Sequence, residues 1–372
     1  MEHVTMSRAS EALPSPWVGA DGHLPLPWLE TGLSAALSQR GHALLVHGPE
    51  GVGQFELAMV LAQSVLCEAP VPARAPTGAP CGHCEACHLL QAGAHPDLMV
   101  LVPEALRESL GLSLASAEGE GEGGEGGAAT GAVTKSKTAG REIRVADVRR
   151  AIDWGHQTSS RGRGKVLVLH PAQALNLVAA NALLKTLEEP AGALRLILST
   201  ADPQALLPTL RSRCQQVQLA MPAPEISARW LEARGVDDAR AVLAAAGGRP
   251  QEALAMVREG LDARRWPELP DAVRQGRAEL FHGLTVPRVV DLLQKICLDL
   301  MSRAQGARAT YFPEEALPAG AQAQALAAWW TQLQRTARHE DHPWNAALLI
   351  ESLVLQGRRC WPVRDTKKPY VR

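Results

Sequence analysis

The pattern of hydrophobic and polar positions changes character along the chain. Between residues 28 and 220, short apolar runs of strand length alternate with longer stretches whose apolar residues recur at helical spacing. The strand candidates read ALLVHG, LMVLVP, KVLVLH and LRLILST. Near-continuous apolar strands separated by helices are typical of a parallel sheet that helices cover. Residues 28–220 therefore predict an α/β domain.

The flanking segments show other patterns. Residues 1–27 are polar and carry several prolines, which predicts a flexible N-terminal arm. After the sequence MPAPE, the apolar spacing is helical only. We expect a small helical unit over residues 221–265 and a larger helical domain over residues 266–372.

A stretch inside the α/β region has almost nothing apolar to bury. Residues 118–140 read EGEGEGGEGGAATGAVTKSKTAG, and ordering such a chain costs backbone entropy that no burial offsets. The sequence predicts a disordered insertion at about residues 105–140, with no function of its own.

Composition narrows the class of protein. The 372 residues carry a formal net charge of -1, so no global basic field indicates a nucleic-acid or membrane binder, although a local basic patch stays open. No apolar run approaches the roughly 18 residues that span a bilayer, and the first residues lack the features of a signal peptide. We therefore expect a cytoplasmic protein, whose seven cysteines are thiols or metal ligands.

A glycine-rich loop follows the first predicted strand. Residues 42–67 read HALLVHGPEGVGQFELAMVLAQSVLC, a strand, a turn and a helix. The phosphate-binding formula G-x-x-x-x-G-K-[ST] places lysine on the β and γ phosphates and a hydroxyl on Mg²⁺. Here the glycine spacing is kept, but glutamine and phenylalanine follow it. The residues of this degenerate loop that could still face a nucleotide are Gly48, Gly51, Gly53 and Gln54.

The strand KVLVLH lacks the acidic pair that holds magnesium and polarises water in an active ATPase. His170 and Pro171 stand at that point, and the nearest acids, Glu188 and Glu189, lie beyond a helical pattern. Lysine, hydroxyl and both acids are thus missing together. We expect no ATP hydrolysis at this site.

A cysteine cluster follows the helix of the glycine loop. Three cysteines in CGHCEAC have two residues between each consecutive pair, and a fourth ends the preceding helix. Four thiolates suit tetrahedral Zn²⁺, and with no open position such a site is structural. His83 and His88 could replace one sulfur, and a redox role is the competing chemistry for C-x-x-C. The candidate metal ligands are Cys67, Cys81, Cys84 and Cys87.

Further motifs give the chain a family likeness. ANALLKTLEEP at residues 180–190 and LLPTLRSRCQ at residues 206–215 resemble segments of the bacterial DNA polymerase III clamp loader, an AAA+ family. The cysteine insertion and AGAHPD at residues 92–97 fit that family too. The resemblance covers roughly residues 28–254 and is weak over the last hundred residues.

This resemblance implies a fold and a site. The fold would be a RecA-like AAA+ domain with a zinc module at about residues 67–90, followed by a helical lid and a helical collar. Clamp loader subunits form a ring in which each ATP lies at a boundary between neighbours. The SRC motif, here Ser212, Arg213 and Cys214, supplies an arginine finger in trans. Among the subunits, the degenerate glycine loop points to the delta-prime type.

The function implied is that of a non-hydrolysing subunit within the DNA polymerase III holoenzyme, a DNA-directed DNA polymerase. Its partners would be the gamma/tau and delta subunits in a hetero-oligomer, and through them the sliding clamp and primer-template DNA. Its cofactor would be structural Zn²⁺, while ATP is held by the neighbouring subunit. Two alternatives remain: an ATP-hydrolysing gamma/tau-type subunit, and a zinc-dependent DNA-binding or repair scaffold on an AAA+ core. The near-neutral charge argues against the scaffold.

Overall fold

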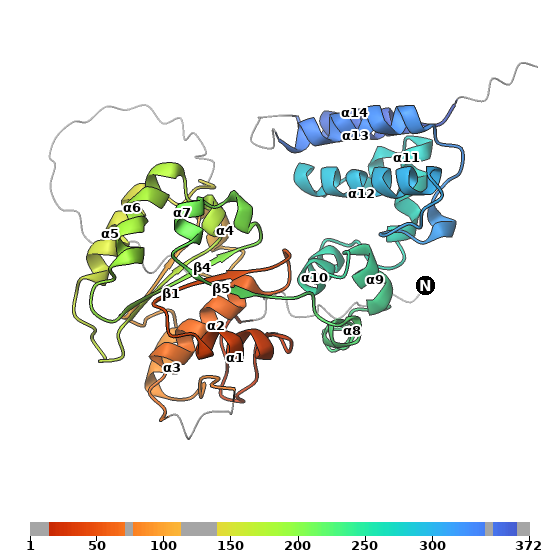
Figure 1. The fold of residues 1–372 in the computed structure, drawn as a ribbon. Coiled ribbons are helices and arrows are strands. Elements are labelled where there is room, and N and C mark those ends of the chain that lie inside the picture. The colour runs from red at the N-terminus through yellow and green to blue at the C-terminus, as the bar shows by residue number, and fades with distance from the viewer. Residues whose placement is uncertain (1–14, 71–76, 113–139, 339–344, 363–372) are drawn as a thin grey trace, which may run out of the picture. The chain divides into compact units, whose positions relative to one another are not determined.

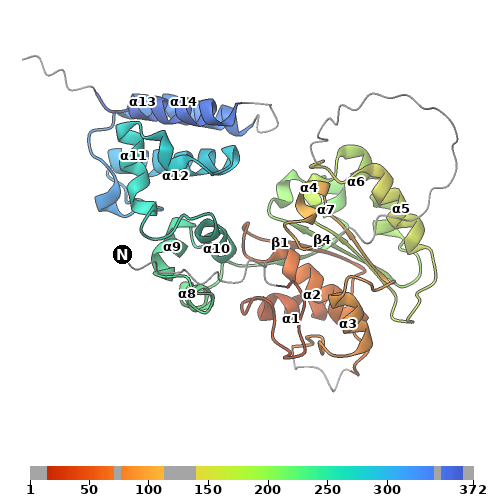
Figure 2. The ribbon, with the colours of Figure 1, turned by 180° about the vertical axis from the view of Figure 1, so that it is seen from behind.

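The computed structural model describes residues 15–70, 77–112, 140–338 and 345–362 (Figures 1 and 2). The chain divides into two compact units, one ending at Pro222 and the other beginning at Ala223. The division lies two residues from the end of the predicted α/β domain.

The first unit is built on a parallel five-stranded sheet, as the alternating pattern predicts. Its strand order is β2-β3-β4-β1-β5, and every described pair is parallel. The strands are β1 (Ala43–His47), β2 (Leu98–Leu101), β3 (Lys165–Leu169), β4 (Leu194–Thr200) and β5 (Gln215–Gln218). The helices are α1 (Leu29–Ser38), α2 (Gln54–Leu66), α3 (Glu85–Gln91), α4 (Glu104–Arg107), α5 (Val145–Gly155), α6 (Leu177–Glu188) and α7 (Pro208–Arg211).

Helices cover both faces of this sheet, which explains why the strands β1, β3 and β4 are apolar on both sides. In Figures 1 and 2, α1, α2 and α3 lie on one face, and α5 and α6 lie on the other. Alternate residues of each strand point to opposite faces. Leu45, Leu167 and Leu196, for example, belong to the core beneath α5 and α6. The α/β fold class is therefore confirmed for this unit.

The parallel arrangement brings several predicted features to one edge. Strands β1, β3 and β4 are neighbours and run the same way, so their carboxyl ends share an edge of the sheet. The glycine loop follows β1, and His170 follows β3. A register of His47 with Thr200 places the start of the loop beside the end of β4.

The end of the expected N-terminal arm packs against the first unit. Val18 and Leu26 are fully buried, although their polar surroundings in the sequence predict a loose segment. The Val18 N–H donates to Gln63 Oε1 at 2.9 Å, and its carbonyl accepts from Gln63 Nε2 at 3.0 Å. This amide on α2 ties residues 15–27 to the domain. Residues 1–14 lie outside the described residues.

The expected Gly/Glu-rich insertion is described only at its edges. Residues 104–107 form α4, and turns follow it to residue 112. The rest of the predicted insertion, residues 113–139, lies outside the described residues.

The second unit contains helices joined by loops, with no strand among its described residues. It contains α8 (Pro224–Glu232), α9 (Ala239–Ala245), α10 (Pro250–Arg258), α11 (Leu269–Gln275), α12 (Val286–Ala304), α13 (Ala323–Ala337) and α14 (Ala346–Arg358). The segments expected as lid and collar fall in this one compact unit. Arg288, near the start of α12, donates hydrogen bonds to Glu252 on α10 and to Glu259, which directly follows α10. These bonds link the segment expected as the lid to the segment expected as the collar. Among the described helices, none has both the length and the apolar character to cross a membrane.

Candidate functional site

The four predicted metal ligands come together in the first unit. Cys67 follows the last residue of α2, Cys81 and Cys84 lie in the loop before α3, and Cys87 lies on α3. Their sulfurs all lie within 4.8 Å of one another. The Sγ–Sγ distances are 3.6 Å for Cys67–Cys81, 3.9 Å for Cys67–Cys84 and 4.0 Å for Cys81–Cys87. The four thiols thus form one cluster that could hold a metal ion.

The spacing of the sulfurs fits a tetrahedral ion. A Zn–S bond of about 2.3 Å in a regular tetrahedron places sulfurs about 3.8 Å apart, in the middle of the observed distances. A disulfide would bring two sulfurs to about 2 Å, so all four are free thiols. Backbone N–H groups also point at the sulfurs, from Cys81 to Cys67 Sγ at 3.5 Å and from Cys84 to Cys81 Sγ at 3.3 Å. Such donors stabilise thiolate charge.

The close packing of the four sulfurs shifts the pKa values of two of the thiols in opposite directions. Burial raises the pKa of Cys84, but backbone N–H groups of Cys87 and Glu68 outweigh it and lower that pKa to about 6. Burial, with the neighbouring sulfurs Cys84 and Cys67, raises the pKa of Cys87. A divalent cation would relieve this repulsion by neutralising the thiolates, which is the chemistry expected of a metal site.

The two histidines of the motif stand apart from the cluster. His83 Nδ1 lies 2.7 Å from the carbonyl oxygen of Cys81, and His88 is exposed on α3. Neither belongs to the group of candidate ligands found among the described residues. The arrangement therefore favours four sulfurs over three sulfurs and an imidazole.

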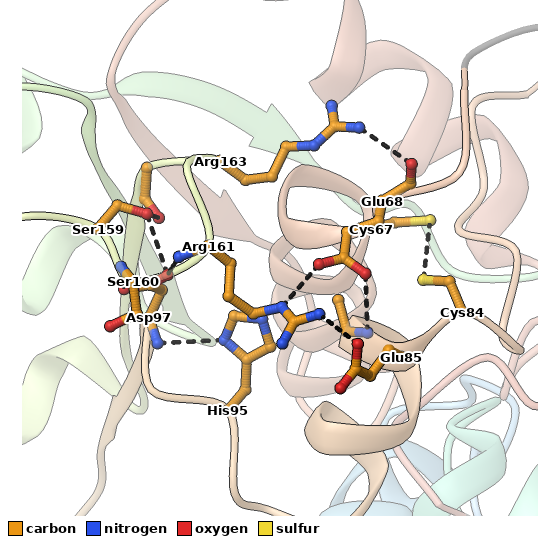
Figure 3. Close-up of polar contacts among 12 residues, drawn as sticks. Cys67, Glu68, Cys84, Glu85, His95, Asp97, Ser159, Ser160, Arg161 and Arg163 are labelled. Atoms are coloured by element: carbon orange, nitrogen blue, oxygen red, sulfur yellow. Dashed lines mark hydrogen bonds and ion pairs between the residues drawn. The ribbon is translucent and has the colours of Figure 1, made fainter.

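An arginine from a distant loop contacts the residues beside two of the cysteines. Figure 3 shows Arg161 reaching between Glu68, which follows Cys67, and Glu85, which follows Cys84. Arg161 Nε donates to Glu68 Oε1 at 2.6 Å, and its Nη2 donates to Glu85 Oε2 at 2.9 Å. Glu68 Oε2 in turn accepts from the backbone N–H of Ala86 at 3.4 Å. The cysteine module is thereby tied to the loop before β3.

That loop is anchored on a fully buried carboxylate. Asp97, just before β2, accepts hydrogen bonds from the N–H groups of Ser160 and Arg161, both at 2.9 Å. Ser159 Oγ and Lys165 Nζ also donate to it, at 3.0 and 3.3 Å. Burial raises the pKa of Asp97, but the four donors together hold it below its ordinary value. An ionised Asp97 therefore fixes the backbone from which Arg161 reaches the module (Figure 3).

The glycine loop is bound to itself. Gln54 is 6% exposed, and its Nε2 donates to the carbonyls of Gly48 and Pro49, both at 2.6 Å. Gly51 and Gly53 have positive φ values of 76° and 101°, which explains why the turn keeps glycine at these positions. The side chain that replaces the phosphate-binding lysine thus contacts the loop's own carbonyls.

The neighbouring positions hold packing residues. The Phe55 ring lies 5.0 Å from that of His170, in the place where an ATPase needs a hydroxyl and an acid. His170 Nδ1 is bonded to Ser199 Oγ at 2.9 Å, and burial lowers the pKa of His170 to about 4. His170 is therefore neutral at pH 7, and this pair supplies neither a magnesium ligand nor a base for water.

The predicted finger, Arg213, lies at the surface on a fixed turn. It is the second residue after α7, and its side chain is 33% exposed. Ser212 Oγ donates to the carbonyl of Thr209 at 3.1 Å, and Cys214 packs in the core of the sheet. Burial raises the pKa of Cys214 to about 12, so this cysteine is an apolar anchor. Arg213 is thus presented between two anchored neighbours.

Sequence reasoning missed the partners of the site residues. It singled out neither Arg161 nor the role of Asp97, although the AGAHPD motif marked the neighbourhood. The signal available was an aspartate at the start of an apolar strand, where a buried charge requires partners. The self-bonding of Gln54 carries no sequence signal.

Comparison with known proteins places the chain among replication proteins. Residues 32–223, about half the chain, match the family model described as DNA polymerase III, delta subunit. The chain is 37% identical over 265 residues to DNA polymerase III subunit delta' of Pseudomonas aeruginosa, covering 69% of this chain and 65% of that protein. It is 32% identical over 238 residues to DNA polymerase III subunit delta' of Escherichia coli, covering 62% and 60%. The chain thus matches somewhat less than two thirds of each relative.

Among solved structures, the chain is similar to a DNA polymerase III gamma subunit-related protein of Thermotoga maritima. The identity is 16%, the coverage is 89% of this chain and 99% of that chain, and the TM-score is 0.47.

Proposed function

The chain belongs to the DNA polymerase III delta subunit family, and on that premise we propose that it is a non-hydrolysing, delta-prime-type subunit of a replicative clamp loader. In this role it presents Arg213 to an ATP held by a neighbouring gamma/tau-type subunit. The assembly, which also includes a delta subunit, uses that ATP to load a sliding clamp onto primer-template DNA.

The observation that carries the proposal is the contrast between two places in the first unit. At the glycine loop, Gln54 bonds the loop's own carbonyls, and Phe55 packs on a neutral His170. At the turn after α7, a guanidinium is held at the surface by an anchored backbone. An arginine placed in trans stabilises charge that develops on the γ-phosphate. The chain therefore supplies part of a site whose nucleotide lies elsewhere.

The proposed AAA+ architecture assigns the helical segments. The parallel sheet supports the α/β core of this proposal, and we assign α8 to α10 to a lid and α11 to α14 to a collar. Exposed Leu348 and Leu355 lie one heptad apart on α14, which suits a helix that packs on neighbouring subunits.

The test is Arg213→Ala in a complex reconstituted with gamma/tau and delta subunits. DNA-stimulated ATP hydrolysis should fall by a factor of about 10³, because removal of an arginine finger costs this order of rate. Arg211→Ala is the matched control, since Arg211 is the last residue of α7, two positions before Arg213, and its loss removes the same charge next to the proposed finger. Assembly, measured by gel filtration, should be unchanged in both. Normal ATP turnover by the Arg213→Ala complex would refute the assignment.

The four-cysteine cluster completes the proposal as a structural zinc site. Cys67, Cys81, Cys84 and Cys87 would hold the ion, which would cross-link the end of α2 to the start of α3. With four protein ligands the ion has no open position for a substrate. Arg161, through Glu68 and Glu85, orients the segments that carry two of the ligands.

The two alternative functions make different predictions. A gamma/tau-type subunit would turn over ATP as an isolated chain, which the residues at Gln54, Phe55 and His170 argue against. A zinc-dependent DNA-binding scaffold would bind DNA tightly when isolated. Measurement of both activities on the isolated chain separates the three cases.

A further inference from the structure

The guanidinium of Arg213 has a carboxylate partner in its own chain. Glu188, the last residue of α6, accepts from Arg213 Nε at 2.6 Å, and the same oxygen accepts from Nη2. Arg213 Nη1 donates to the carbonyl of Thr209 at 2.8 Å. A guanidinium has five N–H groups, and three are used here, so two have no partner among the described residues.

The position of Glu188 at the end of a helix is unfavourable for the free energy of folding. A carboxylate in the last turn of a helix faces the negative end of the helix dipole. The side chains of Glu188 and Arg213 are 50% and 33% exposed, and ion pairs at such sites contribute little to the free energy of unfolding. The pair links the end of α6 to the turn after α7, which lie 25 residues apart in the sequence. The main effect of the pair is therefore to fix the orientation of the Arg213 guanidinium, not to stabilise the fold.

We propose that Glu188 is a positioning residue that orients Arg213 toward the phosphates of the neighbouring subunit's ATP. This inference rests on the proposed function of Arg213. Glu188 occupies the side of the guanidinium formed by Nε and Nη2, and Thr209 takes one N–H of Nη1. The two remaining N–H groups, on Nη1 and Nη2, are left to donate to an anion. An arginine held in this way has fewer rotamers to lose when the neighbour's nucleotide arrives.

The chain offers a matched control for this residue. Glu189 follows Glu188, carries the same charge and is exposed, and no contact with Arg213 is present among the described side chains. Glu189→Ala removes the same negative charge from the end of the same helix as Glu188→Ala does. Any difference between the two positions therefore reports the contact with Arg213.

The experiment measures DNA-stimulated ATP hydrolysis by the reconstituted complex. Glu188→Ala should lower kcat about tenfold, because a misplaced catalytic group loses one to two orders of magnitude in rate. The KM for ATP should stay within about twofold, since the finger acts on charge that develops in the transition state. Glu188→Gln keeps an oxygen that can accept from Arg213, so its kcat should recover to within about threefold of wild type. Glu189→Ala should leave kcat unchanged.

The decisive comparison uses the double variant. If Glu188 acts through Arg213, Glu188→Ala should have no further effect in an Arg213→Ala background. An unchanged or raised kcat for Glu188→Ala, or a further drop in the double variant, would overturn the inference. The single variant Arg213→Ala tests the proposed function separately. Normal ATP turnover by Arg213→Ala would refute the finger itself. Loss of turnover in Arg213→Ala, together with normal turnover in Glu188→Ala, would refute only the positioning role of Glu188.

Discussion

Replacement of Asp97 by asparagine tests the network that joins the cysteine module to the sheet. The Asp97 carboxylate is fully buried and is the ion-pair partner of Lys165, whose side chain is 5% exposed. Asparagine keeps the shape of the Asp97 side chain but removes its negative charge. Its NH₂ group is a hydrogen-bond donor, and it would face groups that themselves donate to Asp97. With its carbonyl toward Ser160, that amide faces the N–H of Arg161.

The expected loss follows from these contacts. Breaking one partner of a buried ion pair costs about 3–5 kcal/mol, since the other charge remains buried. Lys165 retains its position 4.2 Å from the centre of the Trp154 ring, which offsets part of the cost. We expect Asp97→Asn to lower the free energy of unfolding of the first unit by about 3 kcal/mol. This is a large part of a typical domain's total of about 5–15 kcal/mol.

Native-state hydrogen exchange is the appropriate assay, because two compact units need not unfold together. Exchange of amides in β2 (Leu98–Leu101) and β3 (Lys165–Leu169) reports the opening of the first unit alone. Asp153→Asn, on the exposed side of α5, is the control and should change that free energy by less than about 0.5 kcal/mol. A similarly small effect of Asp97→Asn would refute the account of this network.

The pH dependence gives a second readout of the same substitution. The pKa of Asp97 is lower in the folded chain than in the unfolded one, so its stabilisation is present above about pH 4 and is lost as the pH falls through the folded-state value. The difference between wild type and Asp97→Asn should therefore be constant from about pH 7 to 5 and should shrink below about pH 4. A difference that grows on acidification would contradict the sign.

Two further predictions concern the metal. Freshly purified protein should contain about one zinc per chain by atomic absorption, and Cys84→Ser should fall well below that while Cys360→Ser, outside the cluster, should not. A wild-type content far below one would count against the site. Arg161→Met removes the ion pairs to Glu68 and Glu85 but leaves every thiol in place, so zinc should pass to a coloured chelator about tenfold faster. Equal release rates would show that Arg161 does not support the module.

The fold of the first unit could be read largely from its hydrophobic pattern. Four of the five strands are apolar runs, and β1, β3 and β4 are buried on both faces, as expected of a parallel sheet that helices cover. Strand β5, Gln215–Gln218, could not be found this way, because it is polar and pairs with β1 alone. The burial of Val18 depends on Gln63, 45 residues away, which no local pattern reports.

The candidate sites divide in the same way. The spacing in the sequence predicts three of the metal ligands, Cys81, Cys84 and Cys87. Cys67 joins them in the structure because α2 ends at the cluster. Arg213 depended on a family resemblance, since a lone arginine after a turn has no distinctive pattern. In the sequence, its partner Glu188 is only an acid that lies beyond the helical pattern after the strand KVLVLH. Contacts between side chains on separate elements require the folded backbone.

The most direct test of the central claim is single-turnover ATP hydrolysis by the reconstituted complex, with Arg213→Ala in place of wild type. We predict that the amount of ATP bound per complex is unchanged, because Arg213 acts on charge that develops in the transition state, while hydrolysis after addition of primed DNA slows by a factor of about 10³ at the site facing Arg213. Hydrolysis of every bound ATP at the wild-type rate would contradict this prediction.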